Sequence, residues 1–201
     1  MCAMYAETVH IRNSILKEGG AGVCNILLFR VKIFVRLKNT SWVMRIYTNY
    51  KPEIPSQRDW MCGIQCNHSH VDFCLADRLP QLGNITRIQE EGSTWRFLVG
   101  MDPLVDIFVS RDSDSVVTSR EREAVDEWLK SNSMIHVMRD HPHHPWHILA
   151  GMWGAKTFMN RSLMANLTVQ MVLKTDLKHA YGFDQEILRL ILWPATTHLM
   201  V

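Results

Sequence analysis

The stretch from Val105 to Leu129 constrains the fold most strongly, because a short acidic loop there joins a strand signal to a helix signal. Residues 105–110, VDIFVS, form an apolar run typical of a buried strand. Residues 119–129 carry apolar side chains at helical spacing, and Ser119 is the expected cap of that helix. In α/β domains built from such units, ligands gather at the carboxyl ends of the strands.

The rest of the chain continues this alternation and predicts a single α/β domain. Strands are expected at residues 41–49 and 134–140, with a short element at 94–99, and a helix at 162–178. A last helix should follow a turn at Gly182, with Asp184 as its cap, and stop before Pro194. Residues 50–60, which contain two prolines, predict a surface loop.

Composition excludes several classes of protein. Hydrophobic residues make up 47% of the 201 residues, charged residues 21%, and the net charge is +2, so neither disorder nor charge-driven nucleic-acid binding is indicated. The most apolar segment, residues 23–37, contains three basic residues and is too short to span a bilayer. It predicts a buried strand or helix. The N-terminus lacks the pattern of a signal peptide, and we expect no transmembrane segment.

Five of the nine asparagines begin an Asn-x-Ser/Thr sequon, and this excess predicts a glycoprotein of the secretory-pathway lumen. These are Asn39, Asn67, Asn84, Asn160 and Asn166.

Three of the five cysteines cluster in residues 61–74, with two histidines among them. The cluster is compatible with a disulfide-braced loop or a zinc site, and we favour a disulfide among Cys62, Cys66 and Cys74 in an oxidising compartment. Cys2 and Cys24 stay unassigned.

Asp112 and Asp114 flank Ser113 directly after the expected strand. In an extended segment their side chains point to the same side and can share one divalent cation. Mg²⁺ or Mn²⁺ bound there can bridge the carboxylates to phosphate oxygens and stabilise a departing nucleotide diphosphate. A solvated turn is the alternative interpretation of the same pair.

The blocks SRDSDS, REREAVDEWL, HVMRDHPHH, GMWGAK and YGFDQEILRLILWP resemble the Asp-x-Asp glycosyltransferase-like family of the nucleotide-diphospho-sugar transferase (GT-A) superfamily. The resemblance runs from about Trp42 to His198. It implies a Rossmann-like mixed sheet flanked by helices over residues 41–201, whereas residues 1–40 form an atypical segment without the expected opening strand and helix. The implied activity is hexosyl transfer from a nucleotide-sugar donor to a glycan or other hydroxyl acceptor.

The resemblance also implies a metal and donor site. Asp112 and Asp114 would hold Mn²⁺ or Mg²⁺ with the diphosphate, and Arg111 would contact a phosphate or the ribose. His198 would complete the metal shell; imidazole suits Mn²⁺ better than Mg²⁺. The alternative for His198 is a tail residue without a role.

Eight more residues surround the implied cleft: Arg139, Asp140, His141, Gly151, Trp153, Gly154, Asp184 and Gln185. Asp140 and Asp184 would act on hydroxyl groups as bases or hydrogen-bond acceptors. Trp153 would stack on a sugar between two glycines that let the ligand approach the backbone. An Arg139–Asp140 ion pair, a core tryptophan and a helix cap at Asp184 are the structural alternatives.

Two other classes remain open. A zinc-dependent hydrolase would use the histidine-rich loop, His141, His143, His144 and His147, although the prolines at 142 and 145 prevent the helical histidine pair of metalloproteases. An inactive or truncated transferase-like binding module is the third hypothesis.

Overall fold

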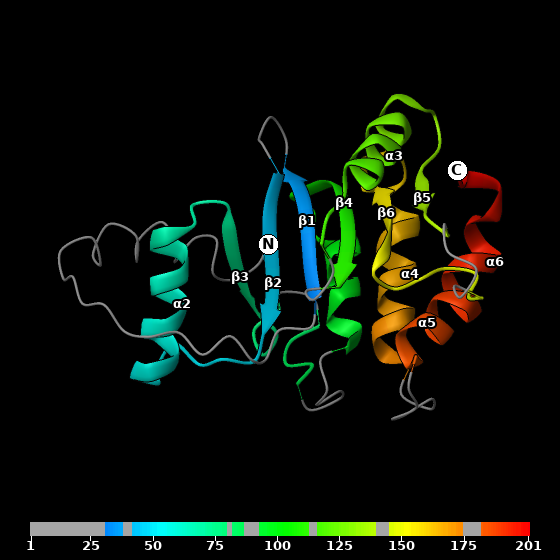
Figure 1. Cartoon of the computed structure of the whole chain (residues 1–201). Coiled ribbons are helices and arrows are strands. Elements are labelled where there is room, and N and C mark those ends of the chain that lie inside the picture. The colour runs from blue at the N-terminus through cyan, green and yellow to red at the C-terminus, as the bar shows by residue number, and fades with distance from the viewer. Residues whose placement is uncertain are drawn as a thin grey trace.

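The computed structural model describes residues 31–37, 42–79, 82–86, 93–112, 116–139, 145–174 and 182–201. It is a mixed α/β structure in which helices flank one central sheet (Figure 1). The α/β class predicted from the sequence is therefore confirmed.

Over the described residues the sheet has six strands in the order β3-β2-β1-β4-β6-β5. Their bounds are β1 Val31–Leu37, β2 Trp42–Thr48, β3 Val71–Leu75, β4 Val105–Asp112, β5 Ile135–Val137 and β6 Met152–Lys156. Strand β3 is parallel to β2, β1 is antiparallel to both β2 and β4, and β6 is antiparallel to both β4 and β5. Consequently β2, β3, β4 and β5 run in one direction, and their carboxyl ends lie at one edge of the sheet.

The longer helices are α2 (Pro55–Asn67), α3 (Ser119–Lys130) and α4 (Arg161–Leu173), and the 3-10 helix η1 covers Ser93–Met101. The short 3-10 helix η2 (Thr157–Met159) precedes α4. The C-terminal region winds through α5 (Phe183–Ile187), the π-helical turn η3 (Leu188–Leu192), α6 (Trp193–Thr196) and the 3-10 turn η4 (Thr197–Leu199).

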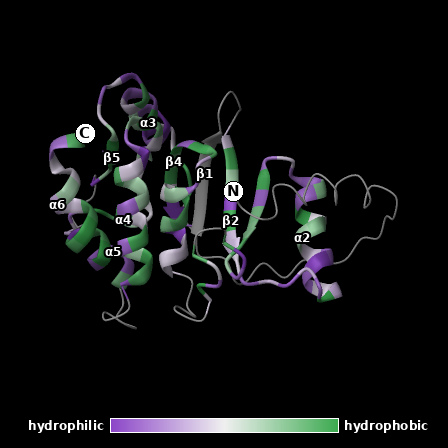
Figure 2. Cartoon of the chain, turned by 180° about the vertical axis from the view of Figure 1, so that it is seen from behind, coloured by the Kyte–Doolittle hydropathy of each residue, from purple (hydrophilic) through white to green (hydrophobic). Residues whose placement is uncertain are grey.

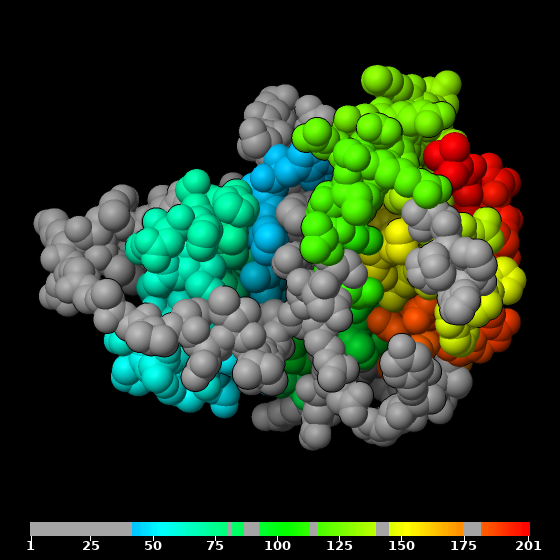
Figure 3. All heavy atoms as spheres, viewed as in Figure 1, coloured from blue at the N-terminus to red at the C-terminus, as the bar shows by residue number. Residues whose placement is uncertain are grey.

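The sheet register assigns these helices to two faces. Met44 of β2 and Val109 of β4 both pair with residue 34 of β1, so their side chains share a face. On that face α2 packs against β2 and β3, and Trp128 of α3 packs against β4. Both helices lie at the surface in the view of Figure 3. Apolar side chains of η1, α4, α5 and η3 cover the other face, and Figure 2 views the molecule from the side of α4 and α5.

The larger core lies under η1 and α4. Trp153 of β6 is fully buried and meets the Phe108 ring edge-on, with 4.9 Å between centroids. Phe97 of η1 packs against the same indole at 6.3 Å. These aromatic rings fix η1 against the middle of β4 and β6.

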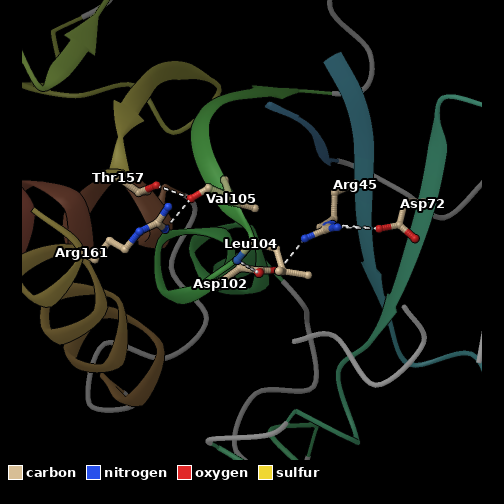
Figure 4. Close-up of polar contacts among 7 residues, drawn as sticks. All are labelled: Arg45, Asp72, Asp102, Leu104, Val105, Thr157 and Arg161. Carbon is tan, nitrogen blue, oxygen red and sulfur yellow. Dashed lines mark hydrogen bonds and ion pairs between the residues drawn. The ribbon is translucent and has the colours of Figure 1, made fainter. Parts of the chain in front are cut away.

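A buried ion-pair network ties η1 to the other end of the sheet (Figure 4). Arg45 of β2 is fully buried, and its guanidinium contacts the Asp72 carboxylate at 2.8 Å and also pairs with Asp102, just after η1. Asp102 in turn accepts a hydrogen bond from the backbone N–H of Leu104 at 2.9 Å. Burial raises the pKa of the neighbouring Tyr47 phenol, which therefore stays neutral. The network fixes the turn that leads into β4.

Three expectations about the ends of helices α2, α3 and α6 were wrong. Helix α2 begins at Pro55, inside the predicted loop, because proline is well tolerated in the first turn of a helix. Thr118, not Ser119, caps α3: its hydroxyl accepts the Glu121 N–H at 3.3 Å. The last helix continues past Pro194, because this proline falls in the first turn of α6, directly after the π-helical turn.

Strand β1 lies inside the segment that we expected to be atypical, residues 1–40, and yet it occupies the middle of the sheet between β2 and β4. The apolar run at residues 23–37 therefore supplies a strand at its carboxyl end, and residues 23–30 lie outside the described residues. The sheet thus continues across the boundary expected near residue 40.

Candidate functional site

The candidate site lies where β4 ends. Asp112 is the last residue of β4 and pairs with Val31 at the start of β1. On the other side Arg111 pairs with Met152, so β6 begins beside the end of β4, directly after Gly151. The carboxyl end of β5 lies at the same edge, as its antiparallel pairing with β6 requires. This is the edge at which ligands bind in α/β sheets.

Asp112 presents its carboxylate at this edge. The Oδ1 atom accepts a hydrogen bond from Nη1 of Arg96 at 2.9 Å, and the side chain is 45% exposed. Gly151 is required beside it, because a Cβ at that position would stand 2.3 Å from Asp112 Oδ2. The backbone before β6 thus lies close to the carboxylate, and any larger residue at position 151 would displace it.

Arg96 of η1 joins Asp112 to a second acid. The Arg96 side chain is only 5% exposed, and its Nη2 lies 3.5 Å from Oδ2 of Asp184 at the start of α5. The Nε atom is buried and makes no hydrogen bond within the described part of the chain. Sequence reasoning missed Arg96; the available signal was one basic residue inside the apolar stretch TWRFLVG.

Asp184 is a largely buried carboxylic acid. Burial raises its pKa above the usual range, Arg96 opposes this shift, and the charge of Asp112 adds to it. Gly182, with φ 77°, is the N-cap of α5, so the expected cap at Asp184 was wrong; its Oδ1 instead accepts the N–H of Gln185 at 3.0 Å. The Oε1 atom of Gln185 is buried without a hydrogen-bond partner among the described residues. A raised pKa makes the ionised Asp184 carboxylate a stronger base than an ordinary aspartate.

Arg111 has a structural role in place of the expected phosphate or ribose contact. Its side chain leaves β4 on the α3 face, where Nε lies 2.7 Å from Oε1 of the buried Glu121. Nη1 donates to the carbonyl of Gly151 at 3.1 Å, and Nη2 donates to that of Val116 at 3.4 Å. These contacts leave the guanidinium buried under α3.

Trp153 and Gly154 belong to the core of the protein. The fully buried Trp153 indole cannot stack on a sugar, so the core alternative holds for this residue. Gly154 faces α3, where a Cβ would stand 2.5 Å from the Phe108 carbonyl oxygen and 3.3 Å from the Trp128 ring. Of the three site residues predicted from the GMWGAK block, only Gly151 lies at the site.

Other predicted residues make different contacts, are exposed, or lie outside the described residues. Arg139 is exposed and sits 5.4 Å over the Trp193 ring, which His147 also contacts at 4.9 Å. His198 is exposed in η4. The residues outside the described ranges are Asp114, Asp140, His141, His143 and His144. The second acid of the expected metal pair and most of the zinc hypothesis therefore remain predictions.

Within the described ranges, no three His, Cys, Asp or Glu side chains come together to hold a metal ion. Mg²⁺ and Mn²⁺ do not require such a group, because one or two carboxylates with phosphate oxygens and waters complete their shells. Asp112 fits this role: it is a hard oxygen donor, half-exposed, at the carboxyl edge of the sheet.

The cysteine cluster does not form the expected disulfide. Cys62 and Cys66 lie on α2 and are free thiols, whereas Cys74 is buried in β3. Because two of the three cysteines are free, no bond joins members of this cluster.

Comparisons with protein-family models, with curated proteins and with solved structures find no match. Among the described residues, no helix has the length and hydrophobicity needed to cross a membrane.

Proposed function

We propose that this chain is a metal-dependent glycosyltransferase that moves a sugar from a nucleotide-sugar donor to a hydroxyl acceptor. The observation that carries the proposal is the position of Asp112: it ends β4, stays half-exposed against Gly151, and is joined through Arg96 to Asp184. A carboxylate for a cation and a second acid thus lie on two sides of one guanidinium. The motif resemblance of residues 42–198 supplies the reaction class.

We also propose the GT-A architecture as the finer description of the fold. Four strands of the mixed sheet run in one direction, helices cover both faces, and the candidate site lies at their shared carboxyl edge. This arrangement suits a nucleotide, because its phosphates can lie at the strand ends where the chain turns away.

In this proposal Asp112, with Asp114 from the segment that follows it, holds Mn²⁺ or Mg²⁺. The cation, when bound, neutralises the diphosphate and stabilises the leaving nucleotide. Arg96 keeps the Asp112 carboxylate fixed through Oδ1, and Gly151 leaves room for it. Asp184 accepts the proton of the acceptor hydroxyl, a role that its raised pKa favours.

The secretory-pathway lumen is the proposed setting. All four sequon asparagines within the described residues, Asn67, Asn84, Asn160 and Asn166, are exposed and accessible to glycosylation. The fifth, Asn39, lies outside the described residues.

A thermal-shift series tests the proposal. UDP- and GDP-sugars with Mn²⁺ should raise the Tm of the native chain, and Asp112→Asn should abolish the shift, because it removes the charged donor but keeps the shape. Asp59→Asn, an acid 69% exposed on α2, is the matched control and should keep the full shift. No shift with any donor, or an equal shift in Asp112→Asn, would refute the assignment. Binding without sugar transfer would favour the inactive module instead.

A further inference from the structure

We propose that Arg96 is a resident counter-ion that makes cation binding at Asp112 depend on the nucleotide diphosphate. The guanidinium disfavours a divalent cation that arrives alone and favours a cation that arrives with the anionic diphosphate. This inference rests on the proposed function, because it concerns the same site and the same ligands.

The guanidinium is fixed beside both acids. Its Nη1 lies 2.9 Å from Asp112 Oδ1 and its Nη2 lies 3.5 Å from Asp184 Oδ2, so each terminal nitrogen faces one of the two acids. The flanking residues Trp95 and Phe97 are buried in the core, which anchors the backbone of η1. Arginine does not lose its proton in proteins, so this positive charge is permanent.

Arg96 weakens the attraction of this site for a cation that arrives alone. It offsets one of the two negative charges of Asp112 and Asp184, and Oδ1 of Asp112 is already bonded to Arg96. A cation on Oδ2 of Asp112 would lie within a few ångströms of a like charge in a partly buried site. Such repulsion lowers cation affinity by about ten- to a hundredfold.

When a diphosphate is also present, the charge of Arg96 favours binding. The negative charge of the diphosphate is attracted by the cation and by Arg96 together, and the buried Nε of Arg96 still has an unused N–H within the described part of the chain. Cation and nucleotide should therefore bind with positive coupling, and by linkage each should tighten the other by the same factor.

The test measures Mn²⁺ binding through the electron paramagnetic resonance signal of free Mn²⁺, with and without UDP. In the native chain UDP should tighten Mn²⁺ binding at least about tenfold. In Arg96→Met, Mn²⁺ alone should bind about tenfold more tightly than in the native chain, and the coupling to UDP should shrink to about threefold or less. Arg96→Lys keeps the charge and should stay close to the native values.

Folding of each variant is checked by near-ultraviolet circular dichroism. If Arg96→Met does not fold, Asp184→Asn decides: it removes a negative charge but keeps Arg96, so Mn²⁺ alone should bind more weakly and the coupling should persist. Native Mn²⁺ affinity that is unaffected by UDP, Arg96→Met that binds Mn²⁺ no more tightly, or Asp184→Asn without coupling would overturn the inference. A native chain that binds no Mn²⁺ and UDP together would overturn the proposed function as well.

Discussion

Arg111 and Asp112 are neighbours at the end of β4, yet their side chains enter two different polar regions. Arg111 lies on the α3 face and pairs with Glu121, and both side chains are less than a tenth exposed, 7% and 8%. Asp112 lies on the opposite face and pairs with Arg96, but its own side chain is 45% exposed. We call the first region the closed pair and the second the open pair.

The polar contacts of the closed pair are made within the protein, because Arg111 also donates to the carbonyls of Gly151 and Val116. At the other end of α3, Lys156 donates to the carbonyls of Trp128 and Ser131, at 2.8 and 2.6 Å. His136 stacks on the Trp128 ring at 5.2 Å. Around the open pair, Nε of Arg96 and Oε1 of Gln185 lack hydrogen-bond partners among the described residues, whereas Nε of Arg111, which also makes no hydrogen bond there, lies 2.7 Å from the Glu121 carboxylate. Together with the 45% exposure of Asp112, this indicates that the closed pair holds α3 on the sheet, whereas the open pair has capacity for a ligand.

The largest expected effect comes from breaking the closed pair. Glu121→Ala should lower the free energy of unfolding by about 3–5 kcal/mol, because it leaves the Arg111 charge buried without its counter-ion. Urea denaturation measures the loss. Glu123→Ala, on the exposed side of the same helix, should change stability by no more than about 0.5 kcal/mol. Equally small losses of stability in both variants would mean that the Arg111–Glu121 ion pair does not hold α3 on the sheet.

The second effect concerns pH on the same face. Burial lowers the pKa of His136 from 6.5 to about 4, so the unfolded chain binds a proton that the folded chain excludes. The His136 contribution to stability is therefore fully present above pH 6.5 and decreases as the pH falls to about 4, by up to about 3 kcal/mol. His136→Phe keeps a ring on Trp128 and should remove this part of the pH dependence. Urea denaturation of both proteins at pH 7 and pH 4.5 measures this part. If both proteins lose the same free energy of unfolding between the two pH values, His136 is not its source.

The strands and helices were predictable where the signal is local. β4 and α3 follow from apolar periodicity alone, whereas α2 was missed because its prolines indicate a loop unless the first one lies in the first helical turn. The period-2 alternation of β6 also separates Trp153 from Gly154, which must face opposite sides of the sheet. Treating the block GMWGAK as one motif hid this difference.

The candidate site was only partly predictable. Asp112 and Gly151 follow from a motif at a strand end, but Arg96 depends on three segments meeting in space: η1, the end of β4 and the start of α5. Arg96 and Asp184 are far apart in sequence, and no local pattern links them. A buried basic residue in an apolar stretch signals that an acid lies nearby, without telling which one.

The third effect tests the open pair through its closest backbone contact. Gly151→Ala would place a Cβ 2.3 Å from Asp112 Oδ2, so the carboxylate must move away and the Arg96 bond must weaken. The cost in stability should be about 1–3 kcal/mol, and the Tm shift from Mn²⁺ and a nucleotide-sugar should be lost. Gly63→Ala, where a Cβ meets nothing within 4 Å, is the control and should stabilise the exposed helix α2 by about 0.5–1 kcal/mol. If Gly151→Ala still binds the ligand, the contact between Gly151 and Asp112 is not part of the binding site.

The smallest expected effect on stability is that of Asp112→Asn. Half of the side chain lies in solvent and Arg96 keeps Asp184 as a partner, so the free energy of unfolding should change by less than about 1 kcal/mol in urea denaturation. If Asp112→Asn lowers the free energy of unfolding as much as Glu121→Ala does, the Arg96–Asp112 pair serves stability, and the argument for a ligand there is lost. A small change accompanied by lost ligand binding would identify Asp112 as an acid that the fold does not need. An acid held in place by a buried arginine, and yet unnecessary for folding, is best explained by what it binds.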